Sequence, residues 1–298
     1  MCLLHALFRS RQELGLELIV AHYDHHLRRT SARDRLFVEQ AARFLDLPFV
    51  VEVNRCKVSK TGSIEDFARK QRYDFLVRAA LKHGVDAIVT AHTRDDQAET
   101  VLLRIMRGTG LSGLQAILPL RKMNGVDLVR PLLIFSRHEV ERFLQEIKVS
   151  FVNDPSNRSL DFTRNKVRRV LIPFLEKEFN PGIKDNLARL ADTAAHDYSF
   201  IETQVALFLK RSLKKVGSNV SFSLKKYRSL HPSIRRMVLR SAFAALYGDA
   251  KPLTLAHIES MDTVLTDSGD PKKCCLPVGV CYDRRGERVI FSFDKMPA

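Results

Sequence analysis

The sequence contains no apolar run long enough to cross a membrane as a helix. Such a span takes roughly 18 or more apolar residues, and no stretch of the 298-residue chain approaches that length. The first residues, Met1–Phe8, also lack the basic start of a signal peptide. These absences argue against a membrane partner and predict a soluble, cytoplasmic protein.

Cysteine is scarce, and its spacing does not indicate metal binding. The five cysteines form no Cys-x-x-Cys pair and none of the spacings typical of zinc sites. The sequence therefore predicts no metal site and no disulfide framework, and the thiols are expected to be buried and reduced. They are Cys2, Cys56, Cys274, Cys275 and Cys281.

Acidic residues are outnumbered by basic ones. The chain carries 49 Lys and Arg against 34 Asp and Glu, which gives a formal net charge of +15 and a pI near 9.8. This charge favours a polyanionic partner, nucleic acid first, over a merely solvated basic surface. The length predicts two domains, because single cores rarely grow past about 250 residues.

Short apolar runs alternate with helical patterns in the first half of the chain, which predicts an α/β fold with a parallel sheet and helices on both faces. Strands are expected at Leu16–Ala21, Phe49–Val53 and Asp86–Thr90, and helices at Arg33–Leu45 and Ser63–Lys82. Residues 114–135 are expected to form a loop with a hairpin turn at Asn124–Gly125. A helix at Ser136–Ile147 follows, begun by Ser136 and Glu139.

A long helix, Ile183–Leu213, is expected to lead into a small α+β domain. That domain is predicted to hold a strand at Val220–Leu224, helices at Ser233–Leu246 and Thr254–Leu265, and a closing pair of strands around Asp283–Gly286.

The stretch Thr90–Gly113 carries the densest polar cluster. A strand ends at Thr90, and a helix follows with Thr93 as its N-cap and Asp96 as capping-box partner. Ligands of parallel sheets bind where strands end, and four side chains are expected there: His92, Asp95, Asp96 and Glu99. Asp96 and Glu99 are three apart and share a helix face. The alternative is that these acids only complement the helix dipole.

Basic residues crowd a helix start after Phe162, where they suit either phosphate binding or a solvated face. Further basic groups in the last third favour contacts to a nucleic-acid backbone. Few aromatics lie among them, which favours duplex or shape recognition over single-strand stacking. The groups are Arg164, Lys166, Arg168 and Arg169; Lys210, Arg211, Lys214 and Lys215; Lys225, Lys226 and Arg228; and Arg235, Arg236 and Arg240.

Several short motifs can be placed together: His22, His25, Leu27 and Arg28; Glu65, Ala68, Arg69, Arg72 and Tyr73; Asp95–Thr100 with Arg107, Gly108 and Gly110; Arg130–Leu133; Asp154, Ser156 and Asn157; and Arg164, Asn165 and Arg168. In this combination the chain resembles the tRNA(Ile)-lysidine synthetases, a branch of the N-type ATP pyrophosphatases with a PP-loop. The resemblance is specific over about Met1–Leu175 and looser beyond.

The resemblance implies a reaction in which ATP, with Mg²⁺, adenylates the C2 oxygen of the wobble cytidine in an isoleucine tRNA with a CAU anticodon. The side-chain amine of L-lysine then displaces AMP to give lysidine. It also implies a catalytic domain over residues 1–175, a helical linker over 176–215 and a basic tRNA-binding domain over 216–298. The oligomeric state stays open, and a homo-oligomer is compatible with the sequence.

The resemblance also implies roles for individual residues. Asp96 and Glu99 would hold the lysine, and Arg69 and Arg72 would steady phosphate or the adenylated base. The nucleotide side would be lined by His22, His25, Arg28 and His92. The tRNA would be held by Arg164, Asn165, Arg168, Lys225, Lys226, Arg228, Arg235 and Arg236.

Two departures from the family pattern matter. Thr93 stands where the family has a second histidine, and the family's Ser-Gly-Gly-x-Asp-Ser phosphate loop, expected before Met1, is not in the sequence. We therefore expect an N-terminally shortened chain with little or no ATP hydrolysis. A related tRNA thiolase and a catalytically silent tRNA-binding protein are the alternatives.

Overall fold

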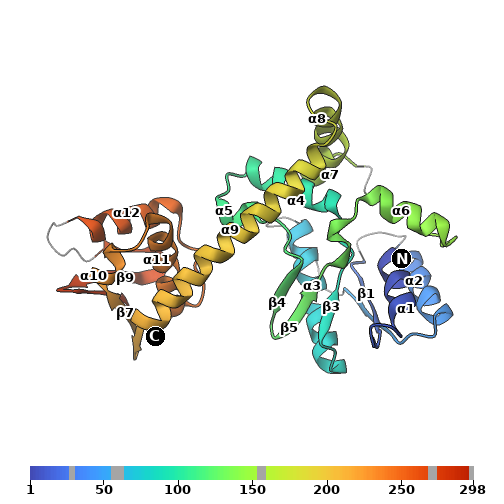
Figure 1. The fold of residues 1–298 in the computed structure, drawn as a ribbon. Helices are drawn as coiled ribbons and strands as arrows, with labels where there is room; N and C mark the ends of the chain where they lie inside the picture. Colours follow the sequence, from blue (N-terminus) through green and yellow to red (C-terminus); the bar gives the residue numbers. More distant parts are fainter. Residues whose placement is uncertain (27–30, 55–63, 153–158, 268–273, 295–298) are drawn as a thin grey trace. The chain divides into compact units, whose positions relative to one another are not determined.

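The computed structural model describes residues 1–26, 31–54, 64–152, 159–267 and 274–294 (Figure 1). The chain divides into two compact units, Met1–Ala195 and His196–Ala298, each with hydrophobic cores of its own. The motif residues Leu27, Arg28, Asp154, Ser156 and Asn157 lie outside the described residues.

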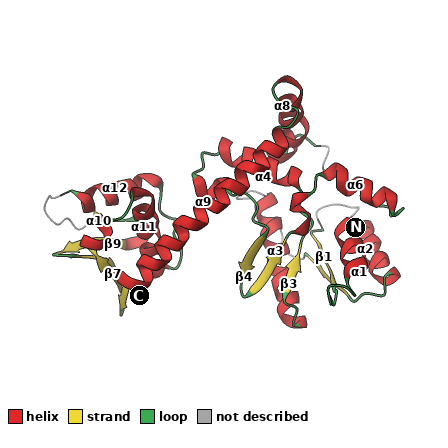
Figure 2. Ribbon diagram, viewed as in Figure 1, coloured by secondary structure: helices red, strands yellow, loops and turns green. Residues whose placement is uncertain are grey.

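Two small sheets form the centre of the first unit (Figure 2). Strands β1 (Val20–Asp24) and β2 (Phe49–Val53) run parallel. Strand β3 (Ala87–Val89) pairs in parallel with β5 (Val126–Val129), and β4 (Leu120–Met123) pairs antiparallel with β5. The parallel pairs alternate with helices along the chain, which confirms the α/β class.

Two strand predictions were wrong in detail. The first strand begins at Val20 and not at Leu16, because its partner β2 begins only after Pro48 and the earlier residues have nothing to pair with. The expected loop over residues 114–135 contains the β4–β5 hairpin, whose pairing with β3 only the tertiary structure supplies. The turn itself is confirmed: Asn124 and Gly125 both have positive φ, of 49° and 90°, as a type I′ turn requires.

The helices of the first unit largely follow the predicted pattern. They are α1 (Cys2–Ser10), α2 (Ser31–Phe44), α3 (Ile64–His83), α4 (Arg94–Met106), α5 (Leu111–Leu114), the 3₁₀ turn η1 (Pro131–Ile134), α6 (Arg137–Glu146), α7 (Thr163–Lys166), the π-helical segment η3 (Val167–Leu171) and α8 (Ile172–Glu178). The long helix α9 (Ile183–Ser212) begins in the first unit and continues into the second. The capping box predicted for the helix after Ser136 is present, with Glu139 as its partner.

Helix α4 is fixed by apolar contacts on its inner face. Ala98 and Val101 are fully buried and share a core cluster with Val167 of η3 and Ile172 of α8. This packing brings the α7–η3 segment onto the helix that carries the acidic cluster. The contact between α4 and η3 therefore brings together the residues of the site described below.

The second unit is a five-stranded antiparallel sheet with helices against it, in the strand order β6-β7-β10-β9-β8. Its elements are β6 (Lys214–Val216), β7 (Asn219–Ser223), α10 (Leu224–Arg228), α11 (Pro232–Tyr247), α12 (Leu255–Thr266), β8 (Cys274–Cys275), the turn η4 (Pro277–Gly279), β9 (Val280–Arg285) and β10 (Arg288–Phe293). Cys2 and Cys281 are buried as expected, but Cys275 is exposed because it lies on the edge strand β8. Over the described parts of the chain, no helix is both long and apolar enough to span a membrane.

Candidate functional site

The N-terminus of α4 is held by a capping box. Thr93 has extended backbone, and its backbone N–H and hydroxyl donate to Oδ2 of Asp96 at 2.9 and 3.0 Å. The predicted N-cap and its partner are thus confirmed. Asp96 is fixed in one rotamer by these bonds, so its other oxygen, Oδ1, is left to face the neighbouring segment.

Two arginines from α7 and η3 reach that oxygen and the carboxylate of Glu99. Arg164 donates to Asp96 Oδ1 at 2.9 Å and to Glu99 Oε2 at 2.8 Å. Arg168 donates to Glu99 at 2.5 and 3.0 Å and to Asp96 Oδ1 at 3.2 Å. The four side chains, here called the acid–arginine quartet, balance one another in charge, and every carboxylate oxygen accepts at least one hydrogen bond.

Burial makes the quartet electrostatically strong. The Glu99 side chain is 1% exposed, and those of Arg164 and Arg168 are about a quarter exposed. Burial alone would raise the pKa of Asp96, but Arg164, the Thr93 N–H and Arg168 outweigh it and hold that pKa below its usual value. Burial likewise opposes the charge on Arg168, yet its bonds to Glu99 raise its pKa.

Beside the quartet lies a cavity of about 1030 Å³ whose wall is rich in arginine. Seven arginines line it against two aspartates, Asp66 and Asp161, so the cavity is strongly positive. Of the quartet only Arg164 is among the lining residues, and it stands between the cavity and the acids. The arginines are Arg69, Arg72, Arg104, Arg107, Arg121, Arg130 and Arg164. A wall of this composition suits phosphate groups.

A comparison with known families matches this part of the chain: the PP-loop domain model covers residues 1–175. The chain belongs to the PP-loop domain family. A second model, described as the TilS substrate binding domain, matches residues 222–287.

The chain is also similar to curated proteins over most of its length. The tRNA(Ile)-lysidine synthase of Geobacter sulfurreducens is 34% identical over 95% of this chain and 60% of its own length. That of Clostridioides difficile is 30% identical over 99% of this chain and 64% of its own length. The chain thus spans about three fifths of the length of these relatives, and the resemblance inferred from the motifs is confirmed.

A solved structure supports the fold alone. The U34-tRNA thiolase NcsA of Methanococcus maripaludis, solved with its [4Fe-4S] cluster, matches 64% of this chain and 66% of its own with a TM-score of 0.55 at 16% identity. At that identity the match indicates shared PP-loop architecture.

Within the PP-loop domain, Arg69 and Arg72 lie on α3 and line the cavity. Their guanidinium carbons lie 5.0 and 5.4 Å from the ring centre of Tyr73, so the aromatic ring holds both. Burial lowers the pKa of Arg72 from its ordinary value.

His92 is a strongly perturbed base of the PP-loop domain. Burial, together with the charges of Arg130, Arg69 and Arg72, lowers its pKa to about 4 against a weaker opposing pull from Asp96. Its Nδ1 lies 3.0 Å from the Thr90 hydroxyl. His92 is therefore neutral at pH 7 and cannot serve as a cation for phosphate.

The other residues predicted for the nucleotide side differ in whether they line the cavity. His25 lines the cavity, whereas His22 lies within β1 and is not among the described lining residues. Burial also lowers the pKa of His22. Arg28 is outside the described residues.

The sequence did not single out four of the cavity arginines as site residues. Arg104 and Arg107 are three apart near the end of α4, and Arg121 lies on the hairpin that was expected to be a loop. Arg130 is 4% exposed and donates to the Leu118 carbonyl at 2.5 Å. Its place in the Arg130–Leu133 motif was the one signal that could have found it.

The basic residues predicted to hold tRNA in the second unit differ in how far their charged groups are already bound within the fold. Lys225 and Lys226 are exposed on α10. Arg228 donates to the carbonyls of Leu265 and Asp267 at the end of α12, at 2.8 and 2.7 Å, and Arg236 pairs with Glu259 at 3.4 Å.

Two further residues from the tRNA prediction are engaged in buried contacts. Arg235 is paired with Asp262, its Nε 2.9 Å from Oδ1, and the same Oδ1 accepts from the Tyr227 hydroxyl at 2.5 Å. Asn165 is buried in α7 and donates to the Ser159 carbonyl at 2.8 Å. Both contacts give these side chains a structural role, beside any role toward RNA.

Proposed function

We propose that the chain carries the catalytic and first RNA-binding parts of a tRNA(Ile)-lysidine synthase. The observation that supports this most directly is an arginine-walled cavity adjoining a buried carboxylate pair inside a PP-loop domain. Within this proposal residues 1–175 perform the chemistry, 176–215 link, and 216–298 contact tRNA.

The reaction joins lysine to the wobble cytidine of an isoleucine tRNA with a CAU anticodon. The cytidine C2 oxygen attacks the α-phosphorus of ATP and pyrophosphate leaves. The side-chain amine of lysine then attacks C2, the bond from C2 to the adenylate oxygen breaks, and AMP leaves with a proton released. Both steps place negative charge on phosphate oxygens, which the cavity arginines are arranged to stabilise.

The residues that line the cavity fit a nucleoside triphosphate. Arg69, Arg72 and Arg130 supply fixed donors for phosphate oxygens, and His25 suits the less charged part of the nucleotide. The neutral His92 is not among the described lining residues and is kept as a proposed contact on the nucleotide side. Mg²⁺ is usually held by one or two carboxylates and the phosphates themselves. Asp66 and Asp161 are the wall carboxylates that would hold it.

Asp96 and Glu99 are proposed to hold the lysine ammonium. Arg164 stands between them and the cavity and is partly exposed, so it is the partner that an incoming ammonium would displace. Arg168, bound to both oxygens of Glu99, keeps the carboxylates in place during that exchange. Arg164, once displaced, is free to pair with a phosphate of the tRNA.

In the second unit Lys225 and Lys226 are proposed as the principal backbone contacts, because their ammonium groups are exposed. Arg228, Arg235 and Arg236 are also proposed to contact tRNA. Some of their N–H groups already donate to, or pair with, groups of the protein itself. Arg164, Asn165 and Arg168 complete the set near the reacting base.

Labelled-lysine incorporation tests the proposal. The proposed function predicts that the full 298-residue chain, supplied with ATP and Mg²⁺, transfers ¹⁴C-lysine to a tRNA(Ile) transcript with a CAU anticodon and not to one with UAU. The absence of the Ser-Gly-Gly-x-Asp-Ser loop from the sequence predicts little or no transfer, and this assay decides between the two expectations. An Asp96→Asn variant should lose the transfer, while Glu141→Gln, on exposed α6, should retain it. Transfer of lysine that does not depend on the wobble cytidine would contradict the proposal.

The two alternatives give different readouts in the same assay. A thiolase would incorporate ³⁵S and no lysine. A silent binding protein would retard the CAU transcript on a gel with no ATP-dependent label of either kind.

A further inference from the structure

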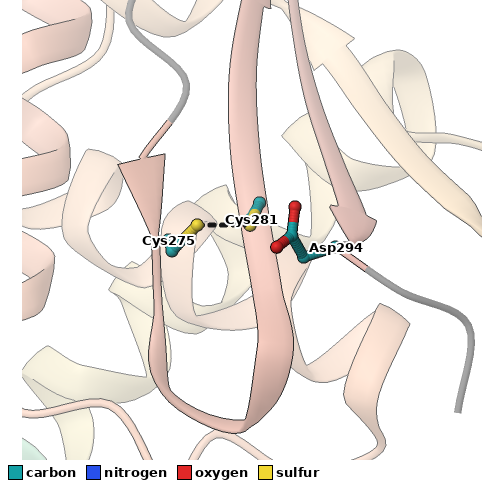
Figure 3. Close-up of side chains that lie close together, drawn as sticks. All are labelled: Cys275, Cys281 and Asp294. Atoms are coloured by element: carbon teal, nitrogen blue, oxygen red, sulfur yellow. Dashed lines mark hydrogen bonds between the residues drawn. The ribbon is translucent and has the colours of Figure 1, made fainter.

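Two cysteines of the second unit face each other across neighbouring strands. Cys275, on the two-residue edge strand β8, is the register partner of Cys281 on β9, and their sulfur atoms lie 2.9 Å apart (Figure 3). The two residues are joined by the short turn that contains η4. This places both thiols on one hairpin, at the margin of the sheet.

The hydrogen-bond pattern of this hairpin sets the distance between the two backbones. Leu276 N–H donates to the Val280 carbonyl at 2.6 Å, so the next pair along, Cys275 with Cys281, is a non-hydrogen-bonded pair. Such pairs have Cα atoms about 4.5 Å apart. Disulfides accept Cα separations of about 4.4–6.8 Å, so a bond can form here without moving either strand.

The surroundings distinguish the two thiols. Cys274, Val280 and Tyr282 pack against the core cluster of the unit, so Cys275 and Cys281, which alternate with them, point to the opposite face of the sheet. Cys275 is exposed and Cys281 is buried. The exposed thiol is the one that a dissolved reagent reaches first.

The carboxylate of Asp294, just past β10, completes a group whose ligand atoms all lie within 4.8 Å of one another (Figure 3). Two thiolates on one zinc, at about 2.3 Å each in a tetrahedron, lie roughly 3.8 Å apart. The observed 2.9 Å lies about midway between that spacing and a direct sulfur–sulfur bond of about 2.05 Å, so the distance alone does not decide between them. A structural zinc takes four protein ligands, whereas the group in the described residues offers three, and this favours a bond between the thiols over a structural metal.

We propose that Cys275 and Cys281 are a reversible thiol–disulfide pair that ties the edge strand β8 to β9. The oxidant is a low-molecular-weight disulfide. The Cys275 thiolate attacks one of its sulfurs and one thiol leaves; the Cys281 thiolate then attacks Cys275 and the second thiol leaves. The two cysteines give up two electrons, the reagent is reduced to two thiols, and the two protein protons end on them.

The pair is testable on the intact chain with oxidised glutathione. After reduction, desalting and oxidation, the chain is unfolded in guanidinium chloride, and we expect iodoacetamide to modify three of the five cysteines instead of five. Trypsin yields one peptide, Cys274–Arg284, that contains all three cysteines of this region. That peptide should be lighter by two hydrogens and carry no glutathione.

Fragmentation of the same peptide assigns the bond without any variant. A ring between Cys275 and Cys281 leaves the Cys274–Cys275 peptide bond outside it, so cleavage there releases Cys274. Rings that include Cys274 suppress that fragment. Cys275→Ser and Cys281→Ser should abolish the mass loss, and Cys274→Ser, the matched control on the same strand, should keep it.

Three results would overturn the proposal. Glutathione that stays attached to Cys275 would show that Cys281 cannot reach it. A bond that persists in Cys275→Ser would assign a different pair. One equivalent of zinc bound to the reduced chain, lost in Cys275→Ser and blocking oxidation, would assign a metal site with Asp294 instead.

Discussion

At the residue scale, Glu99 shows why a buried charge requires partners. Its carboxylate is 1% exposed, and the free energy lost on leaving water is recovered only through the bonds from Arg164 and Arg168. The acid at Asp96 is partly exposed and is anchored by Thr93 as well. Glu99 is therefore the member whose loss costs the most stability.

We expect Glu99→Gln to destabilise the first unit by about 3–5 kcal/mol, because two arginines would then share a single carboxylate in a buried site. Urea unfolding followed by circular dichroism measures this. The control, Glu141→Gln, breaks an exposed pair with Arg137 and should cost less than about 1 kcal/mol. Equal effects of the two substitutions would contradict the electrostatic account of the quartet.

His92 gives a pH dependence of known sign. Its pKa is about 4 in the folded chain against 6.5 ordinarily, so between these values the unfolded chain binds a proton that the folded chain does not. The stability that His92 contributes is complete above pH 6.5 and is lost as the pH falls toward 4, by at most roughly 3 kcal/mol.

Unfolding free energies measured from pH 7 to pH 4 test this. His92→Asn should flatten the fall in that window, whereas His138→Asn, on exposed α6, should leave it unchanged. Asp96, whose pKa is lowered, acts in a separate window, below its ordinary value of 3.8. A wild-type profile that is flat from pH 6.5 to 4 would rule out the assignment.

At the scale of elements, the sequence predicted those features that depend on interactions between residues close together in the chain. The capping boxes at Thr93 and Ser136 were predictable because cap, partner and helix lie within a few residues. Strand β4 was missed because Leu120–Lys122 are exposed and show no buried alternation; it exists through pairing with β5. The pairing of β4 with β5 depends on tertiary structure and cannot be predicted from the residues of β4 alone.

The β4–β5 turn offers a prediction about backbone conformation. Gly125 has a φ of 90°, and a methyl group added there would meet nothing within 4 Å, so Gly125→Ala tests conformation alone. We expect a loss of about 1 kcal/mol in thermal or urea unfolding. Gly110→Ala, equally open but with a φ of −88°, should be nearly neutral. A loss at Gly110 as large as at Gly125 would refute the explanation.

The candidate site shows the same difference between features set by near neighbours in the chain and features set by tertiary contacts. Asp96 and Glu99 were placed on one face by helix spacing, and their meeting with Arg164 and Arg168 depends on the core contact between α4 and η3. The sequence assigned the acids and the arginines to different ligands and gave no sign that they pair. The sequence also did not predict that Arg235 pairs with Asp262 while Lys225 is exposed, because both residues lie in similar basic groups.

At the scale of the whole molecule, the net charge of +15 bears on the proposed binding of tRNA, because contacts to phosphate depend on salt. Each released counterion contributes to the slope of log affinity against log salt concentration, by about 0.7–0.9 per phosphate contact. Exposed lysines count fully in that slope, whereas arginines bound within the fold count less.

We therefore expect the double substitution Lys225→Ala with Lys226→Ala to reduce the salt slope of tRNA binding by about 1.4–1.8, with unfolding free energy changed by less than about 0.5 kcal/mol. Filter binding over a range of KCl concentrations measures the slope. Lys177→Ala with Lys251→Ala removes the same charge elsewhere and should leave the slope almost unchanged. An equal change in both doubles would mean that net charge alone governs binding.

The arginine wall of the cavity has a consequence for the abundance of the protein. Seven guanidinium groups around one hollow repel one another whenever no anion lies between them, and any polyanion that enters turns that repulsion into attraction. A ligand that binds only the folded chain raises the folded fraction by mass action. Under the proposed function, the supply of nucleotide and RNA would thus help set how many copies survive proteolysis, and the protein would persist best where both are present.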